Sequence, residues 1–292
     1  MPIVTVLAAP SRADLSPERL DAIRAMLEGG PARWLAPGVA AEFPVDYVPD
    51  AFDAVRDGEE RAGFDLALTP AEGRRKALLL ADMDSTMIEQ ECIDELARVA
   101  GVEGRVQAIT ARAMNGELGF HEALLERLAL LASLPETAIG EVLAQHITLA
   151  PGGRALVATM RANGAYTALV SGGFTDFTGP VAQTLGFDEH RGNTLLTEDG
   201  VLTGHVALPV LGSTAKLEAL QEIAAARGLS LDDAAAVGDG ANDLPMIQAA
   251  GLGVALHAKP AVAAAAPVRL HHADLTGLLY LQGYSEDEIL PG

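Results

Sequence analysis

The sequence predicts an α/β fold with a Rossmann-like, three-layer core around a parallel sheet, and two observations support this. From residue 76 onward, short apolar runs of strand length alternate with helical stretches, which is typical of parallel strands joined by crossover helices. The helical stretch at about 90–148 is much longer than a crossover requires. We therefore expect a helical cap inserted there, standing over the carboxyl ends of the strands.

The candidate strands of the sheet are the apolar runs at 77–81, 167–170, 234–237 and 253–255. Runs of this length that end in polar residues suit strands buried on both faces. Within the cap, leucines recur at helical spacing, as at Leu124, Leu128 and Leu131. Asp199 and Gly200 predict the turn of a hairpin.

The first 75 residues predict a separate, small α+β domain, and residues 76–292 form the core with its cap. Ser16 and Pro17 suit the start of a helix, as N-cap and first helical residue. Strand-like segments lie at 3–8, 41–48 and 64–68, with a charged helical stretch near 53–61. The basic segment 73–76 is the expected junction.

Composition argues against several classes of function. The chain has 20 basic and 40 acidic residues, so its net charge of −20 argues against nucleic acid or an anionic membrane as a partner. The N-terminus lacks the pattern of a signal peptide, and no apolar run reaches the ~20 residues that span a bilayer. We expect a cytoplasmic protein. A phosphate-containing substrate would need local positive groups to overcome the overall field.

Two smaller features predict structure rather than chemistry. Cys92 is the single cysteine, so no internal disulfide can form, and its helical context predicts a small buried side chain. His271, His272 and Asp274 could suggest a second metal site. Adjacent histidines point apart and no partner cluster is evident, so we expect a structural or surface role.

The clearest sign of function is the pair Asp82 and Asp84, which follows the first apolar run and precedes Ser85 and Thr86. In open α/β sheets, ligands bind beyond the carboxyl ends of the strands. Two acids there suggest a site for a hard cation, at which one carboxylate could also attack a substrate. Taken alone, Asp-x-Asp also fits an ordinary solvated turn.

Three further groups follow at strand ends or helix starts. Ser171, Gly172 and Gly173 suit close approach of backbone N–H groups to an anion, although a plain glycine turn has the same pattern. Lys216 begins a helical run and could clamp a phosphoryl group, although most lysines are solvated. The last group surrounds an acid at the end of a strand and comprises Gly238, Asp239, Asn242 and Asp243. The recurrence of such groups is more informative than any one of them.

In this order, the four groups resemble the motifs of the haloacid dehalogenase (HAD) superfamily and, within it, the phosphoserine phosphatases. Asp82–Thr86 is similar to the first motif, Ser171–Gly173 to the second, Lys216 to the third and Gly238–Asp243 to the fourth. The resemblance extends over about 76–285 and includes the cap positions at which that family contacts its substrate, namely Glu91, Met114, Phe120 and Arg127. The N-terminal unit is loosely similar to ACT-like regulatory domains.

The resemblance implies a role for each residue. Asp82 would be the nucleophile that forms an aspartyl phosphate, and Asp84 the general acid and then the base. Neighbouring carboxylates do not both ionise easily, so one can hold the proton that this chemistry needs. Magnesium would be held by the side chains of Asp82 and Asp239 and the backbone carbonyl of Asp84. The phosphoryl group would be bound by Ser171, Gly172, Gly173, Lys216 and Asn242, with Asp243 orienting Lys216 or a metal-bound water.

By the same resemblance, the substrate would be the small molecule phosphoserine, hydrolysed to serine and phosphate in the last step of serine biosynthesis. Glu91 would pair with its ammonium group and Arg127 with its carboxylate. Transfer of the phosphoryl group to another hydroxyl compound uses the same residues, so that alternative stays open. A regulatory protein without catalysis is disfavoured, because all the acids and the lysine of the motifs are present.

Overall fold

The computed structural model describes residues 1–114, 117–212 and 214–292, without the side chains of Met114 and Phe120. Its centre is a six-stranded parallel sheet with the strand order β12-β11-β10-β5-β6-β7. The strands are β5 (Leu78–Ala81), β6 (Tyr166–Phe174), β7 (Glu189–Asn193), β10 (Ala234–Gly238), β11 (Leu252–Leu256) and β12 (Val268–Leu270). The four strands predicted from the sequence are the four central ones, which confirms the predicted fold class. The edge strands β7 and β12 were not predicted.

The sheet is buried on both faces, because successive side chains of each strand point to opposite layers. Leu79 packs in the cluster formed with the helices of one layer, and Leu80 in the cluster of the other. The first layer contains α7 (Gly153–Ala162), α8 (Thr175–Leu185) and α12 (Gly277–Leu281), and the second contains α9 (Ala215–Ala226) and α10 (Leu244–Ala249). A further helix, α11 (Pro260–Ala265), contacts β11 and β12.

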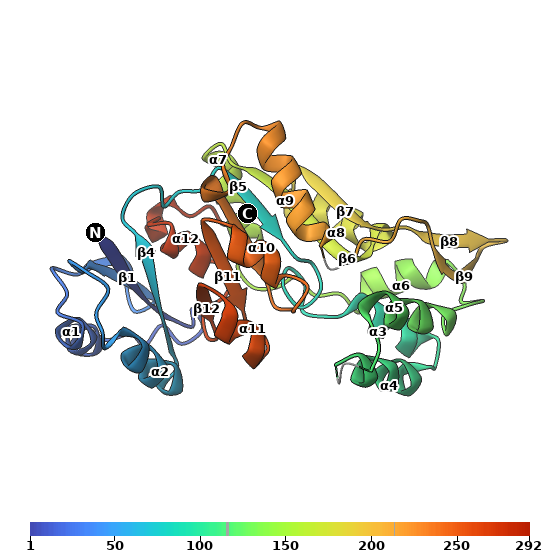
Figure 1. Ribbon diagram of the computed structural model, residues 1–292, viewed down its shortest axis with the longest axis horizontal. Coiled ribbons are helices and arrows are strands. Elements are labelled where there is room, and N and C mark those ends of the chain that lie inside the picture. Colours follow the sequence, from blue (N-terminus) through green and yellow to red (C-terminus); the bar gives the residue numbers. More distant parts are fainter. Residues whose placement is uncertain (115–116, 213) are drawn as a thin grey trace.

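The predicted cap is present between β5 and α7. Its helices are α3 (Cys92–Val99), α4 (Glu103–Met114), α5 (Phe120–Ala129) and α6 (Thr137–Gln145). The chain enters and leaves the cap at neighbouring points, because Ile88 forms a β-bridge with Leu149. Figure 1 shows the cap, in green, at one end of the molecule, and the N-terminal residues, in blue, at the other.

The predicted hairpin forms part of the support of the cap. It consists of β8 (Leu195–Glu198) and β9 (Val201–Val206). The backbone N–H of Ser133 donates to the carbonyl of Leu202, and the N–H of Leu202 donates to the carbonyl of Leu134, both at 2.8 Å. The hairpin therefore joins the core to the connection between α5 and α6.

The N-terminal residues form an antiparallel sheet with the strand order β2-β3-β1-β4. Its elements are β1 (Pro2–Ala8), α1 (Pro17–Met26), β2 (Arg33–Ala36), β3 (Ala40–Pro44), α2 (Phe52–Ala62) and β4 (Phe64–Pro70). Ser16 caps α1 by accepting a hydrogen bond from the N–H of Arg19 at 3.2 Å, and Pro17 begins the helix. Val4, Ile23 and Phe43 belong to a buried cluster of this unit alone.

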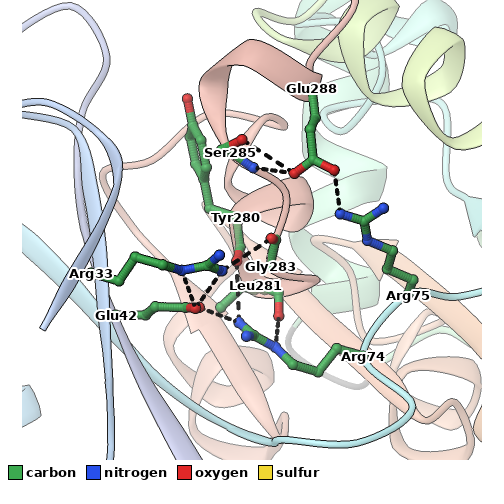
Figure 2. Close-up of polar contacts among 9 residues, drawn as sticks. All are labelled: Arg33, Glu42, Arg74, Arg75, Tyr280, Leu281, Gly283, Ser285 and Glu288. Carbon is green, nitrogen blue, oxygen red and sulfur yellow. Dashed lines mark hydrogen bonds and ion pairs between the residues drawn. The ribbon is translucent and has the colours of Figure 1, made fainter. Parts of the chain in front are cut away.

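Charged side chains fasten this N-terminal sheet to the C-terminal part of the core. Figure 2 shows the buried carboxylate of Glu42 between Arg33 and Arg74, each at 2.7 Å. Arg74 also donates to the carbonyl oxygen of Leu281 at 3.1 Å, at the end of α12. Since cations interact favourably with the carbonyl end of a helix, Arg74 ties α12 to β3.

A second attachment uses Asp65 of β4, which is fully buried. Its carboxylate accepts backbone hydrogen bonds from His271, His272 and Ala273 at 2.8–2.9 Å. The two histidines therefore contribute their backbone to a structural contact, as expected for a structural role.

No helix within the ranges described above combines the length and the apolar character needed to cross a membrane.

Candidate active site

The carboxyl ends of β5, β6 and β10 and the helices of the cap enclose a cavity of about 470 Å³. The sheet contributes Asp82 and Asp84 after β5, and Asp239 after β10. Residues 171–173, expected to follow a strand that ends at 170, instead continue β6, whose pairing with β7 shifts register between Val170 and Phe174, and they line the cavity. The cap contributes Glu91 and Arg127. Residues from three predicted motifs and from the cap thus meet at one site.

The two carboxylate oxygens of Asp82 differ in their contacts: Oδ1 has hydrogen-bond and ion-pair partners, whereas Oδ2 faces no described donor. Its Oδ1 accepts a hydrogen bond from the N–H of Met83 at 2.7 Å and lies 2.6 Å from Nζ of Lys216. Among the described residues, Oδ2 has no hydrogen-bond partner. Burial, followed by repulsion from Asp243, raises the pKa of Asp82, whereas Lys216 opposes this shift. The arrangement suits a nucleophilic oxygen that needs positive charge nearby in order to stay ionised.

Asp84 is held by both of its carboxylate oxygens. Oδ1 accepts from the N–H of Cys92 at 2.9 Å, and Oδ2 accepts from Oγ of Ser171 at 3.2 Å. A Cβ atom at Gly173 would lie 2.8 Å from Oδ2, so only glycine permits this approach. Burial raises the pKa of Asp84, which favours a carboxyl group that can hold and release a proton.

Cys92 serves this site through its backbone. The side chain is buried, as expected, and burial raises the pKa of its thiol, so it is not a reactive thiolate.

Lys216, which the resemblance assigns to the phosphoryl group, is not among the described residues that line the cavity. It is buried and forms ion pairs with both Asp82 and Asp243. Burial alone would lower the pKa of Lys216, but the two carboxylates raise it overall. The second oxygen of Asp243 accepts a hydrogen bond from the N–H of Gly240 at 2.9 Å. A Cβ atom at Gly238 would lie 2.3 Å from Cγ of Asp243, which explains the glycine at the end of β10. Asp243 therefore positions Lys216.

Three carboxylates could hold a metal ion, since one oxygen each from Asp82, Asp239 and Asp243 lies within 4.8 Å of the others. An all-oxygen donor set suits a hard divalent cation. Burial, followed by Asp243, raises the pKa of Asp239 to about 6. Buried acids with raised pKa values indicate missing positive charge, which a cation would supply. Both oxygens of Asp243 already have partners, so Asp82 and Asp239 fit best as side-chain ligands.

The irregular segment of β6 at 171–173 forms the wall at which an anion could bind. Ser171, Gly172 and Gly173 line the cavity. Asn242, which follows β10, lines it from another side. The sequence did not reveal which residue supports this segment of β6. Asn193, which is buried, donates from Nδ2 to the carbonyl of Gly172 at 2.8 Å. A lone asparagine in a polar edge strand has no signal that would reveal this role.

The cap contributes one carboxylate and one guanidinium group to the wall of the cavity, and both could form further hydrogen bonds with a ligand. Oε1 of Glu91 accepts from Oγ of Ser85 at 2.8 Å, and the enclosing walls, followed by repulsion from Asp84, raise the pKa of Glu91 to about 7. Solvent still reaches this carboxylate through the cavity. Arg127 donates through Nε to the carbonyl of Ala123 at 3.2 Å. In the described part of the chain, its terminal amino groups have no partner.

Met114 ends α4 and Phe120 begins α5, but their side chains lie outside the described residues. The cavity also contains residues that the sequence did not identify as candidates for the site. These are Ile93, Asp94, Thr110, Leu124, Phe174 and Lys259. Lys259 could have been considered, because it follows a predicted strand at the same edge of the sheet as Asp82 and Asp239.

Comparison with known proteins agrees with this geometry. Residues 79–248 match the model of the family described as haloacid dehalogenase-like hydrolase. A phosphoserine phosphatase of Albidiferax ferrireducens is 44% identical over 209 residues, which cover 70% of this chain and 88% of that protein. The phosphoserine phosphatase of Streptomyces coelicolor is 40% identical over 260 residues, 85% of this chain. The chain spans 53% and 63% of the length of the Mycobacterium tuberculosis and S. coelicolor relatives.

Solved structures give the same result. A HAD family hydrolase of Salmonella enterica serovar Typhi superimposes with a TM-score of 0.85 at 28% identity, over 99% of this chain and 100% of that one. A phosphoserine phosphatase solved as an analogue of its phospho-aspartyl intermediate has a TM-score of 0.66 at 40% identity, over 70% of this chain and 98% of its own. With this sequence match, this fold and these acids at the strand ends, the chain belongs to the haloacid dehalogenase-like hydrolases.

Proposed function

We propose that this protein is a magnesium-dependent phosphoserine phosphatase that hydrolyses O-phospho-L-serine to L-serine and phosphate. One observation carries the proposal. Asp82, one of whose carboxylate oxygens has no hydrogen-bond partner among the residues that the structure describes, lines the same cavity as Glu91 and Arg127. A candidate nucleophile thus shares one cavity with a carboxylate and a guanidinium group, whose charges are opposite to those of the ammonium and carboxylate groups of a free amino acid. The similar proteins named as phosphoserine phosphatases support the same substrate.

The first half of the reaction follows from the two acids. Oδ2 of Asp82 attacks phosphorus, and the bond from phosphorus to the serine oxygen breaks. Asp84, whose raised pKa favours the protonated form, donates a proton to that oxygen as serine leaves. The product on the enzyme is an aspartyl phosphate at Asp82.

The second half returns the enzyme to its starting state. Asp84, now ionised, accepts a proton from a water molecule that attacks the phosphoryl group. The bond between phosphorus and Asp82 breaks, phosphate leaves, and Asp84 again carries its proton. One carboxyl group thus serves as acid and then as base.

The remaining residues bind and orient the phosphoryl group. Ser171 and Gly172 offer a hydroxyl and a backbone donor from one wall, and Gly173, whose N–H donates to Oγ of Ser171 at 2.8 Å, orients that hydroxyl. Asn242 offers an amide from another wall. Lys216 keeps Asp82 ionised and in place, and Asp243 keeps Lys216 in place. A magnesium ion held by Asp82 and Asp239, with the backbone carbonyl of Asp84, would neutralise charge on the phosphoryl oxygens.

The cap selects the substrate. Glu91 pairs with the ammonium group, which would lower the pKa of this carboxyl from its value near 7 and keep it ionised. Arg127 receives the carboxylate with its terminal amino groups, which no described residue engages and which suit two parallel hydrogen bonds. We also propose that residues 1–75 form a domain of their own, which their separate buried cluster supports.

The direct test is phosphate release from a panel of substrates, with magnesium present or chelated. The panel contains phosphoserine, phosphothreonine, a sugar phosphate and p-nitrophenyl phosphate. We expect phosphoserine to have the highest kcat/KM, and both chelation and Asp82→Asn to abolish turnover while the circular dichroism spectrum is unchanged. Preference for a sugar phosphate would refute the substrate, and near wild-type release by Asp82→Asn would refute the nucleophile.

The alternative, transfer of the phosphoryl group to another hydroxyl compound, is separated by product analysis. An alcohol such as glycerol is added at high concentration, and phosphorylated alcohol is measured beside free phosphate. We expect free phosphate to remain the main product.

A further inference from the structure

Lys259 is a cation that lines the cavity near the reacting acids, and the mechanism above gives it no role. It follows β11 and precedes Pro260, the first residue of α11. This position places it at the carboxyl end of the sheet, where it lines the cavity beside Asp239 and Asn242. Its side chain is exposed, so it lies where a ligand entering from solvent would meet it.

The cavity that Lys259 lines is strongly acidic. Five carboxylates line it among the described residues: Asp82, Asp84, Glu91, Asp94 and Asp239. The cations in the same lining are Arg127, on the cap wall, and Lys259, on the sheet wall. Lys216 is buried beneath and engaged by two carboxylates. A phosphate group approaching a protein of net charge −20 therefore meets one mobile positive charge on the wall where phosphorus reacts.

Lys259 is also uncommitted. Within the described ranges, its ammonium group has no hydrogen bond and no ion pair. The other two lysines are engaged, since Lys216 pairs with acids and Lys76 donates to the carbonyls of Gly73 and Asp232, both at 2.7 Å. The chain has 3 lysines and 17 arginines, so lysine is the rarer choice for a cation in this sequence.

The charge of Lys259 acts on the site. It lowers the pKa of Asp239, against the larger effects of burial and Asp243 that raise it. A lysine ammonium is a compact point charge on a flexible stem, so it can follow an anion inward and release it afterwards. An arginine in its place would have a rigid fork and a wider planar head.

We propose that Lys259 binds the phosphoryl oxygens of the substrate as it enters the cavity, and those of phosphate as it leaves. This inference rests on the proposed function, because it takes the ligand of the cavity to be a phosphomonoester. Lys259 thereby supplies the local attraction that an acidic protein lacks, and hands the phosphoryl group to Ser171 and the backbone N–H of Gly172.

The first test compares Lys259→Gln with Lys259→Arg and with Lys76→Gln. Lys76→Gln is the matched control, because it removes the same charge before β5, at the opposite edge of the sheet. For Lys259→Gln we expect KM for phosphoserine to rise about tenfold with kcat nearly unchanged. The difference should shrink as ionic strength rises. Lys259→Arg should recover most of the loss, and Lys76→Gln should match the wild type.

A lower kcat with unchanged KM would overturn the proposal, since Lys259 would then act on the chemical step. A weaker response to magnesium would also overturn it, because loss of a cation beside Asp239 should leave magnesium binding unchanged or tighter.

The second test uses inorganic phosphate, so that it does not depend on the identity of the substrate. Binding of phosphate to the magnesium-loaded protein is measured by calorimetry. We expect Kd to rise about tenfold in Lys259→Gln and to stay unchanged in Lys76→Gln. If the wild type binds phosphate but hydrolyses a phosphomonoester other than phosphoserine, the substrate proposal fails while this one stands. If Kd and KM are both unchanged in Lys259→Gln, this proposal fails while the substrate proposal stands.

Discussion

Nζ of Lys216 lies 2.6 Å from Oδ1 of Asp82, and both side chains are almost completely buried. Lys216 also pairs with Asp243, so one ammonium group balances two carboxylates below the reacting oxygen. Breaking a buried pair by removing one partner is costly, because the remaining charge has neither water nor a counter-charge.

Lys216→Met should therefore destabilise the protein by about 3–5 kcal/mol at neutral pH and abolish turnover. The cost should decrease as pH falls. Without Lys216, the pKa of Asp82 rises further in the folded state, so the folded variant takes up a proton that relieves the repulsion between Asp82 and Asp243. Urea unfolding of variant and wild type at pH 7.5 and 5.5, without magnesium, measures this difference. Equal stability of the two proteins at pH 7.5 would contradict the buried ion pairs.

Asp84→Asn should separate the two halves of the reaction. An amide cannot protonate serine as it leaves, so kcat for phosphoserine should fall about 10²–10⁴-fold. With p-nitrophenyl phosphate, whose leaving group needs no proton, the first half should survive while hydrolysis of the aspartyl phosphate stays slow. We expect a burst of p-nitrophenolate equal to the enzyme concentration in a stopped-flow experiment. Absence of the burst would count against Asp84 as the acid.

Arg127→Ala should change substrate preference more than chemistry. Loss of the carboxylate partner should raise KM for phosphoserine about 10–100-fold, while KM for p-nitrophenyl phosphate should change little. Arg112→Ala is the matched control, because Arg112 lies on the cap, is exposed, and pairs with Glu126. Steady-state kinetics of both variants on both substrates decide the point. Parallel losses for Arg127→Ala on the two substrates would argue against the clamp.

Magnesium binding should weaken as the medium becomes acidic. The pKa of Asp239 is raised to about 6 without a metal, so below pH 6 a proton occupies the carboxylate that the cation needs. The magnesium concentration for half-maximal activity should be constant above pH 7 and rise about tenfold for each pH unit below 6. Activity titrations with magnesium from pH 5 to 8 provide the measurement. A flat profile would exclude Asp239 as a ligand.

Asp65→Asn should loosen the attachment of the N-terminal sheet. An amide nitrogen would face backbone N–H groups that now donate to a carboxylate, so we expect a loss of about 2–4 kcal/mol. Asp53→Asn, on the exposed side of α2, is the control and should change stability by less than about 0.5 kcal/mol. Thermal unfolding checks both variants. Unchanged stability of Asp65→Asn would show that this contact contributes little.

The central strands could be predicted from the sequence because strands at the centre of the sheet are buried on both faces and are therefore continuously apolar. Strand β5 is a run of apolar residues, and its neighbours have the same pattern because they too are buried on both faces. The edge strand β7 has the sequence Glu-His-Arg-Gly-Asn, which contains no apolar residue, and β12 has only three residues. Their strand conformation depends on pairing with β6 and β11, which is tertiary information.

The site divides in the same way. Asp82, Asp84 and Asp239 could be predicted because polar groups recur directly after apolar runs of strand length, whose carboxyl ends meet at one edge of a parallel sheet. Asn193 could not, since its hydrogen bond to Gly172 depends on how an edge strand lies beside β6. The support of Asp84 by the backbone of Cys92 is likewise independent of the side chain at that position.

The two ends of the cap are neighbours in space, because Glu89 donates through its N–H to the carbonyl of Thr148 at 2.9 Å and Ala150 donates to Met87 at 3.0 Å. A segment whose ends meet can be lengthened, shortened or exchanged without opening the sheet, since the chain resumes where it departed. The edge of the sheet and the insertion can thus be treated as two separable modules. A chimaera that carries a foreign insertion between residues 89 and 148 would inherit a new substrate while keeping the old chemistry.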